Sequence, residues 1–130
     1  MGVKLQMIHK ECGKGQFEVV VKYDDVQLVL DQYHLVKEAI SHHFRSRNMV
    51  ALFLPKTNVY GSGCHVHMSI WKDGQNVIGD PDTKTGLSEA GENFFAGVFN
   101  HYNALFHFLC PQPNSLRRVL PSHWVGAYKF

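Results

Sequence analysis

The segment HKECGKGQFE, residues 9–18, combines an imidazole with two carboxylates. Glu11 and Glu18 flank Gly13 and Gly15, and two glycines allow a turn sharp enough to bring the carboxylates together. Two carboxylates and an imidazole suit Mg²⁺ or Mn²⁺, with water and substrate phosphates completing the coordination. The alternative is a glycine-containing turn with solvated carboxylates, and the segment read alone favours this alternative.

A second candidate, GSGCHVHMSIW at residues 61–71, places two histidines one residue apart. Residues 62–71 are predicted to form a strand, in which alternate side chains point to the same face. His65, His67 and Ser69 would therefore share one polar face. The cysteine before His65 would point the other way, which disfavours a tetrahedral zinc site built from this segment. The pattern fits a ligand-binding face and an ordinary half-exposed strand equally well.

The third candidate is NSLRRVLP at residues 114–121, which follows a proline-rich break and contains adjacent arginines. Arg117 and Arg118 can bind a carboxylate or a phosphate through two parallel hydrogen bonds. Read alone, the pair is more typical of two solvated surface cations. A nucleic-acid-binding surface is not predicted, because the basic residues are scattered and the net charge is only +2.

The overall composition predicts one domain of a protein from a reducing compartment. With 130 residues, 45% hydrophobic side chains and nine phenylalanines, the chain suits a single packed interior. Its three cysteines cannot all pair within the chain, and the first residues lack the features of a secretory signal. No apolar run is long enough to span a membrane. We therefore expect a cytoplasmic protein that does not bind membranes.

The predicted elements indicate an α+β fold, with helices packed on a mostly antiparallel sheet. Asp24 or Asp25 can cap a first helix that ends near Asn48. Ser88 can cap a second helix, which runs to Leu109 and is ended by the CPQP that follows. The remaining predicted elements are strands at 16–23, 49–55, 62–71 and 76–79, and a hairpin turn at 72–76 that Asp-Gly favours.

In this order, the three candidate segments resemble the catalytic domain of glutamine synthetase. HKECGKGQFE is similar to the family's H-x-E followed by G-Q-x-E, GSGCHVHMS to its G-S-G-x-H-x-H-x-S, and NSLRRVLP to its N-S-Y-x-R-x-x-P. Three motifs in the same order are specific where one would be weak, and the resemblance covers essentially residues 1–130. It implies a ligase that uses ATP and Mg²⁺ or Mn²⁺ to join glutamate and ammonia through a γ-glutamyl phosphate.

The resemblance also implies roles for individual residues. These are metal binding for Glu11, Glu18 and His65, nucleotide binding for His67 and Ser69, substrate contact through the backbone for Gly61, and binding of the substrate carboxylate for Arg118. Arg118 would therefore lie at the catalytic centre. Arg117 occupies a position that the family does not fix in type.

Two positions depart from the family pattern. Tyr60 stands where an asparagine usually precedes Gly-Ser-Gly, and Trp124 stands where a glutamate usually helps to deprotonate ammonium. Because an indole cannot accept a proton, the expected substrates are glutamate or another carboxylate, and ammonia or another amine. PSHWVGAY, residues 121–128, resembles instead the divergent nodulin/glutamine synthetase-like branch.

The family pattern is only partly present in residues 1–130. The family's N-terminal β-grasp domain, an earlier carboxylate pair and the C-terminal part with its further arginines have no counterpart here. We therefore expect a partial catalytic domain that is inactive alone, and a homo-oligomeric ring only for the full-length parent protein. The alternatives are a non-catalytic remnant or interaction module that keeps nucleotide or metal binding, and a zinc-binding module.

Overall fold

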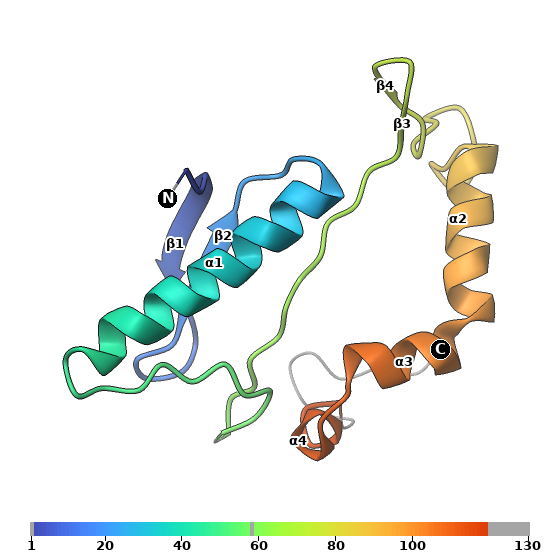
Figure 1. The fold of residues 1–130 in the computed structure, drawn as a ribbon. Helices are drawn as coiled ribbons and strands as arrows, with labels where there is room; N and C mark the ends of the chain where they lie inside the picture. Colours follow the sequence, from blue (N-terminus) through green and yellow to red (C-terminus); the bar gives the residue numbers. More distant parts are fainter. Residues whose placement is uncertain (1, 58, 120–130) are drawn as a thin grey trace. The chain divides into compact units, whose positions relative to one another are not determined.

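The computed structural model describes residues 2–57 and 59–119, and the chain divides into two compact units, residues 1–60 and residues 61–130. The first unit contains β1 (Leu5–Lys10), β2 (Phe17–Val21) and α1 (Val26–Arg45). The second contains β3 (Trp71–Lys72), β4 (Gln75–Asn76), α2 (Glu89–Asn100), α3 (Tyr102–Leu109) and α4 (Pro113–Leu116) (Figure 1). Helices combined with small antiparallel sheets confirm the predicted α+β class.

In the first unit, β1 and β2 form an antiparallel hairpin (Figure 1). The valine-rich β2 confirms the strand predicted at 16–23, whereas no strand is predicted from the sequence where β1 lies. Gly15, in the connecting turn, has a positive φ of 69°, a conformation that glycine adopts at little cost. The hairpin therefore reverses the chain between Glu11 and Glu18.

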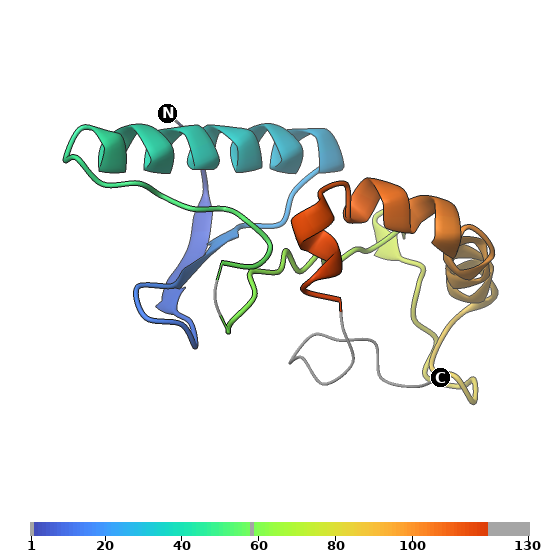
Figure 2. The same cartoon turned by 90° about the horizontal axis from the view of Figure 1, so that it is seen from below.

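Helix α1 lies alongside this hairpin in both views (Figures 1 and 2). The predicted cap is confirmed at Asp25, whose carboxylate accepts a hydrogen bond from the backbone N–H of Gln27 at 3.0 Å. The buried Gln32 ties the helix to the start of the hairpin, because its Oε1 accepts from the backbone N–H of Lys4 at 2.8 Å. The helix ends close to the predicted Asn48, which has a positive φ of 56° that asparagine tolerates.

Two predicted strands, at 49–55 and 62–71, are wrong, and the one predicted at 76–79 is present only as the short β4. Within the described residues, only the last residue of the second prediction, Trp71, belongs to a strand. Apolar, β-branched runs suit a strand, but a strand also needs a neighbouring backbone to satisfy its N–H and C=O groups. The first segment is not buried either, since Val50 is 79% exposed.

The two short strands of the second unit, β3 and β4, form a hairpin whose predicted Asp-Gly turn is confirmed. Asp73 and Gly74 both have positive φ, 51° and 77°, as a two-residue turn between twisted strands requires. Ser88 caps α2 as predicted, its Oγ accepting a backbone N–H of the first turn at 3.1 Å. The single helix predicted from Ser88 to Leu109 is instead two helices, because the backbone at His101 leaves the helical conformation, with φ −106° and ψ 12°.

The packed hydrophobic interior predicted from composition is not found, since no hydrophobic side chain among the described residues is buried. The buried polar side chains there are Gln32 and Ser115. A two-stranded sheet with one helix can cover only one of its faces, so apolar side chains such as Phe17 stay largely exposed. In the same part of the chain, no helix combines the length and the apolar character needed to cross a bilayer.

Candidate functional site

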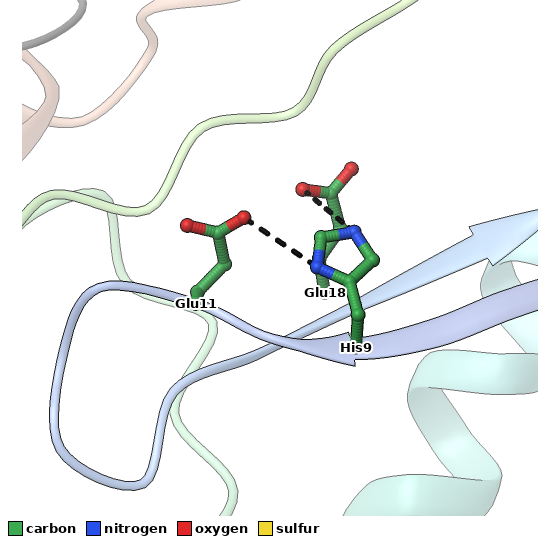
Figure 3. Close-up of side chains that lie close together, drawn as sticks. All are labelled: His9, Glu11 and Glu18. Carbon is green, nitrogen blue, oxygen red and sulfur yellow. Dashed lines mark ion pairs between the residues drawn. The ribbon is translucent and has the colours of Figure 1, made fainter.

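The β1–β2 hairpin brings His9, Glu11 and Glu18 together (Figure 3). His9 and Glu18 are opposed partners in the antiparallel pair, and Glu11 follows His9 by two residues, which places it on the same side. The imidazole Nε2 of His9 lies 3.7 Å from Glu18 Oε2, and its Nδ1 lies 3.8 Å from Glu11 Oε1. One possible ligand atom from each residue lies within 4.8 Å of the other two.

Gln16 holds the turn between the two carboxylates. Its side-chain Oε1 accepts a hydrogen bond from the backbone N–H of Gly13, and its backbone carbonyl accepts one from Glu11, both at 2.9 Å. Gly13 is buried, and a Cβ there would lie only 2.8 Å from that Oε1. Gly13 thus permits close packing and Gly15 permits the positive φ, and together they let Glu11 and Glu18 converge.

This cluster fits a divalent cation. The side chains of His9, Glu11 and Glu18 are 37%, 35% and 37% exposed, so water can complete the coordination of an ion that they hold. All three side chains point to the same side of the hairpin (Figure 3). The predicted convergence of the two carboxylates is confirmed, and the donor set of two oxygens and one nitrogen is compatible with Mg²⁺ or Mn²⁺.

In the second unit, His65 and Arg118 meet at Gly63. A Cβ built on Gly63 would lie 3.8 Å from His65 Nε2 and 4.0 Å from Nη1 of Arg118. Helix α4 positions the arginine, whose backbone N–H donates to the carbonyl of the buried Ser115 at 3.0 Å. The second and third sequence motifs therefore converge, and Arg118 is half-buried there while Arg117 is exposed.

His67 and Ser69 lie on an exposed segment of the same unit, and Gly61 is half-buried at its start. Ser69 Oγ accepts a hydrogen bond from the indole Nε1 of Trp71 at 2.9 Å, which leaves the hydroxyl proton for another acceptor. Because no strand forms here, strand alternation does not place these side chains on one face with His65. The prediction that His65, His67 and Ser69 share one face of a strand is therefore wrong.

The His9 imidazole was grouped with the two carboxylates from the sequence, but neither its position opposite Glu18 on β1 nor the approach of Arg118 to Gly63 was predicted. The alternating apolar and polar residues of LQMIHK were the available signal for β1, and with β1 in place the pairing of His9 with Glu18 follows. No local sequence signal predicts that Arg118 approaches Gly63, because the two residues are distant along the chain.

The other singled-out residues lie outside these two groups. Cys12 and Cys64 are exposed, and neither joins a cluster of three possible metal ligands in the described part of the chain. The zinc-module alternative therefore gains no support from these residues. Tyr60 is 51% exposed, and Trp124, like all of PSHWVGAY, lies outside the described residues.

Comparison with known proteins points to one family. The family model described as "Glutamine synthetase, catalytic domain" matches residues 1–130. The chain is 31% identical to the type-1 glutamine synthetase 1 of Dictyostelium discoideum over 96% of its length. It is 37% identical to the glutamine synthetase of Frankia alni over 94% of its length, and 33% identical to that of Thermococcus kodakarensis over 98%. It spans 26–29% of the length of these relatives.

Proposed function

The chain belongs to the glutamine synthetase family, whose catalytic domain matches residues 1–130, and on this premise we propose that it supplies part of the active site of an ATP-dependent carboxylate–amine ligase. The observation that carries the proposal is the convergence of His9, Glu11 and Glu18 at one end of the β1–β2 hairpin. This convergence supports the proposal, because phosphoryl transfer from ATP requires a divalent cation close to the phosphates.

The proposed reaction has two steps. The γ-phosphoryl group of ATP is transferred to the side-chain carboxylate of glutamate, or of another amino acid, giving an acyl phosphate and ADP. Ammonia, or another amine, then attacks the acyl carbon, inorganic phosphate leaves, and the nitrogen loses a proton to give the amide. The first step needs positive charge near the phosphates, and the second needs the acyl phosphate held close to the amine and away from water.

Glu11 and Glu18 would hold one divalent cation, Mg²⁺ or Mn²⁺, in the first unit. When bound, such an ion neutralises phosphate charge and orients the transferred group. The two carboxylates lie on one side of the hairpin at half-exposed positions, which leaves room for water and phosphate oxygens as further ligands.

The second unit would supply the groups that bind nucleotide and substrate. Arg118 is suited to a carboxylate, because its guanidinium is always charged and can donate two parallel hydrogen bonds. Arg118 is half-buried, and its Nη1 and the Nε2 of His65 lie 4.0 Å and 3.8 Å from a Cβ built on Gly63, so both side chains reach the same point of the chain. We assign His65 to a second cation, His67 and Ser69 to the nucleotide, and Gly61 to the substrate through its backbone.

We propose that residues 1–130 form a partial catalytic domain and that the chain alone is inactive. Catalysis of this kind depends on several charges converging on one transition state, and the loss of one can cost orders of magnitude in rate. A homo-oligomeric ring is expected only for a longer protein that carries this segment. The competing proposal, a non-catalytic remnant that still binds nucleotide or metal, is favoured by Trp124, which cannot act as a base.

The ligase proposal is tested by hydroxamate formation from glutamate, ATP and hydroxylamine in a longer protein that contains residues 1–130. We expect activity in the wild type and a loss of roughly 100-fold or more in Glu18→Gln, which removes a charge but keeps the shape. His42→Gln, an exposed change on α1, serves as the control and should keep wild-type activity. Metal and nucleotide binding without any turnover of a carboxylate would instead support the remnant.

A further inference from the structure

We propose that His9 is itself a ligand of the cation held by Glu11 and Glu18, so that this site prefers a divalent transition-metal ion to Mg²⁺. The inference rests on the proposed function, because it concerns the same cation. The inference adds His9 as a nitrogen ligand, which the family motif does not assign, and it adds a preference among metal ions that follows from this ligand.

The distances from the His9 ring nitrogens to the two carboxylates are too long for hydrogen bonds, and they are compatible with a metal ion between the groups. Its Nε2 lies 3.7 Å from Glu18 Oε2 and its Nδ1 lies 3.8 Å from Glu11 Oε1, both longer than a hydrogen bond. Two ligand atoms that each lie about 2.1 Å from one ion are separated by about 3–4 Å, depending on the angle between them. The separation of Nε2 from Glu18 Oε2 falls in that range, and one possible ligand atom from each of the three residues lies within 4.8 Å of the other two.

The contacts of the imidazole indicate which nitrogen would bind. Nδ1 of His9 lies 3.4 Å from the backbone carbonyl oxygen of Lys10, which can only accept a hydrogen bond. A proton on Nδ1 suits this neighbour and leaves the lone pair on Nε2, the nitrogen that faces Glu18. A ring nitrogen held by a backbone carbonyl, with the other nitrogen on the metal, is the usual arrangement of histidine ligands.

The donor set then decides the selectivity. Carboxylates and water alone suit Mg²⁺, Ca²⁺ and Mn²⁺, whereas an imidazole nitrogen raises the affinity for later first-row ions such as Co²⁺ and Zn²⁺. Mg²⁺ gains little from a nitrogen ligand and usually keeps several waters. We therefore expect affinity to rise in the order Mg²⁺, Mn²⁺, Co²⁺, Zn²⁺, and the step from Mg²⁺ to Co²⁺ to depend on His9.

The test is metal binding to the 130-residue chain, measured by calorimetry with Mg²⁺ and Co²⁺ added separately. We expect His9→Gln to lower Co²⁺ affinity about tenfold or more while changing Mg²⁺ affinity by less than about twofold. Glu11→Gln should lower the affinity for both ions. His42→Gln, which alters an exposed histidine on α1 outside the cluster, should change neither, and circular dichroism should show that each variant is folded.

A second measurement does not depend on any variant. With Mn²⁺ bound to the wild-type chain, electron spin-echo spectra should show modulation from a directly coordinated ¹⁴N nucleus. Absence of that modulation, or equal Co²⁺ affinity in the wild type and His9→Gln, overturns the assignment of His9. If Glu11→Gln and Glu18→Gln also leave Mg²⁺ and Co²⁺ binding unchanged, the cation site of the proposed function fails as well, and the two failures are thereby distinguished.

Discussion

His9 and Glu18 face each other directly across the β1–β2 hairpin, with the imidazole Nε2 3.7 Å from the carboxylate Oε2. This relationship depends on strand register, because a slip of one residue would turn Glu18 to the opposite face of the sheet. The turn that joins the strands therefore controls the candidate metal site. Its geometry is fixed by Gln16, Gly13 and Gly15.

Gly15→Ala should weaken both the hairpin and metal binding. Gly15 has φ 69° with no atom within 4 Å of a Cβ, so the cost comes from backbone strain alone, roughly 1–2 kcal/mol. Gly15→Asn is the matched control, because asparagine tolerates this conformation better. Hydrogen exchange of the β1 and β2 amides and a Mn²⁺ titration measure the two effects, and equal behaviour of the alanine and asparagine variants would contradict the explanation.

The local signals in the sequence predicted the parts of the fold that depend on neighbouring residues. The caps at Asp25 and Ser88 and the turn at Asp73 and Gly74 each form from side chains or backbone conformations within three residues. The convergence of Glu11 with Glu18 also followed from the glycines between them. These features need no knowledge of what packs against them.

The features that the sequence did not predict depend on partners that are distant along the chain. The segments 49–55 and 62–71 have strand-like residues, yet a strand requires a second backbone to pair with. In the described residues, only Trp71 of these segments belongs to a strand, β3, which pairs with β4. The approach of Arg118 to Gly63 joins two motifs through α4, which has no periodic pattern of its own. Composition likewise predicted a packed hydrophobic interior that the described residues do not have, because composition does not tell which surfaces pack against one another.

Gly91→Ala should destabilise the second unit by roughly 1–3 kcal/mol. A Cβ on Gly91 would meet the backbone of Ile78, lying 3.2 Å from its carbonyl carbon and closer still to the oxygen. That oxygen also accepts a hydrogen bond from the backbone N–H of Ser88 at 2.9 Å, so it cannot move away freely. Thermal unfolding followed by circular dichroism measures the loss.

Gly97→Ala is the control for this substitution, because it lies in the same helix with nothing within 4 Å of its Cβ. It should stabilise α2 by about 0.5–1 kcal/mol, since alanine loses less backbone entropy than glycine. The contact with Ile78 would be the wrong explanation if both alanine variants shifted stability in the same direction.

Asp24 should titrate below the ordinary range of an aspartate. The backbone N–H of Asp25, which donates to Oδ1 at 3.0 Å, and the Lys4 ammonium, 3.3 Å from Oδ2, both lower the pKa of Asp24. The pKa of Asp24 is lower in the folded protein than in the unfolded chain. The ionised carboxylate therefore stabilises the folded protein at pH values above the unfolded-state pKa, and this stabilisation is lost as the pH falls through the folded-state pKa.

The side-chain part of this effect can be separated from the backbone part. Lys4→Met should raise the pKa of Asp24 towards its ordinary value without reaching it, because the Asp25 N–H still donates. Lys22→Met, which removes a weaker charge interaction, should raise it less. The pKa of Asp24 in each variant is measured by NMR, from the ¹³C shift of its carboxyl carbon as a function of pH. An unchanged Asp24 pKa in Lys4→Met would contradict the role of the ion pair.

If the proposed ligase function holds, Trp124 should change which amine a longer protein that carries this segment uses. In the family pattern this position holds a glutamate that attracts ammonium and takes its proton, and an indole offers neither a base nor a negative charge. Its face can still hold an organic cation by cation–π attraction. We therefore predict that a longer protein carrying this segment uses ammonium poorly and prefers a bulkier primary amine, or uses no amine.

The measurement is amide formation with ammonium and with a panel of primary amines, in the wild type and in Trp124→Glu. If the base is what the site lacks, Trp124→Glu should gain ammonium activity by roughly 100-fold or more, the range that general base catalysis supplies. Wild-type activity with ammonium equal to that of an ordinary glutamine synthetase would show that Trp124 does not occupy the position of the base. No gain in Trp124→Glu would mean that a second defect limits the reaction, and Tyr60, which replaces the usual asparagine before Gly61, is then the residue to change next.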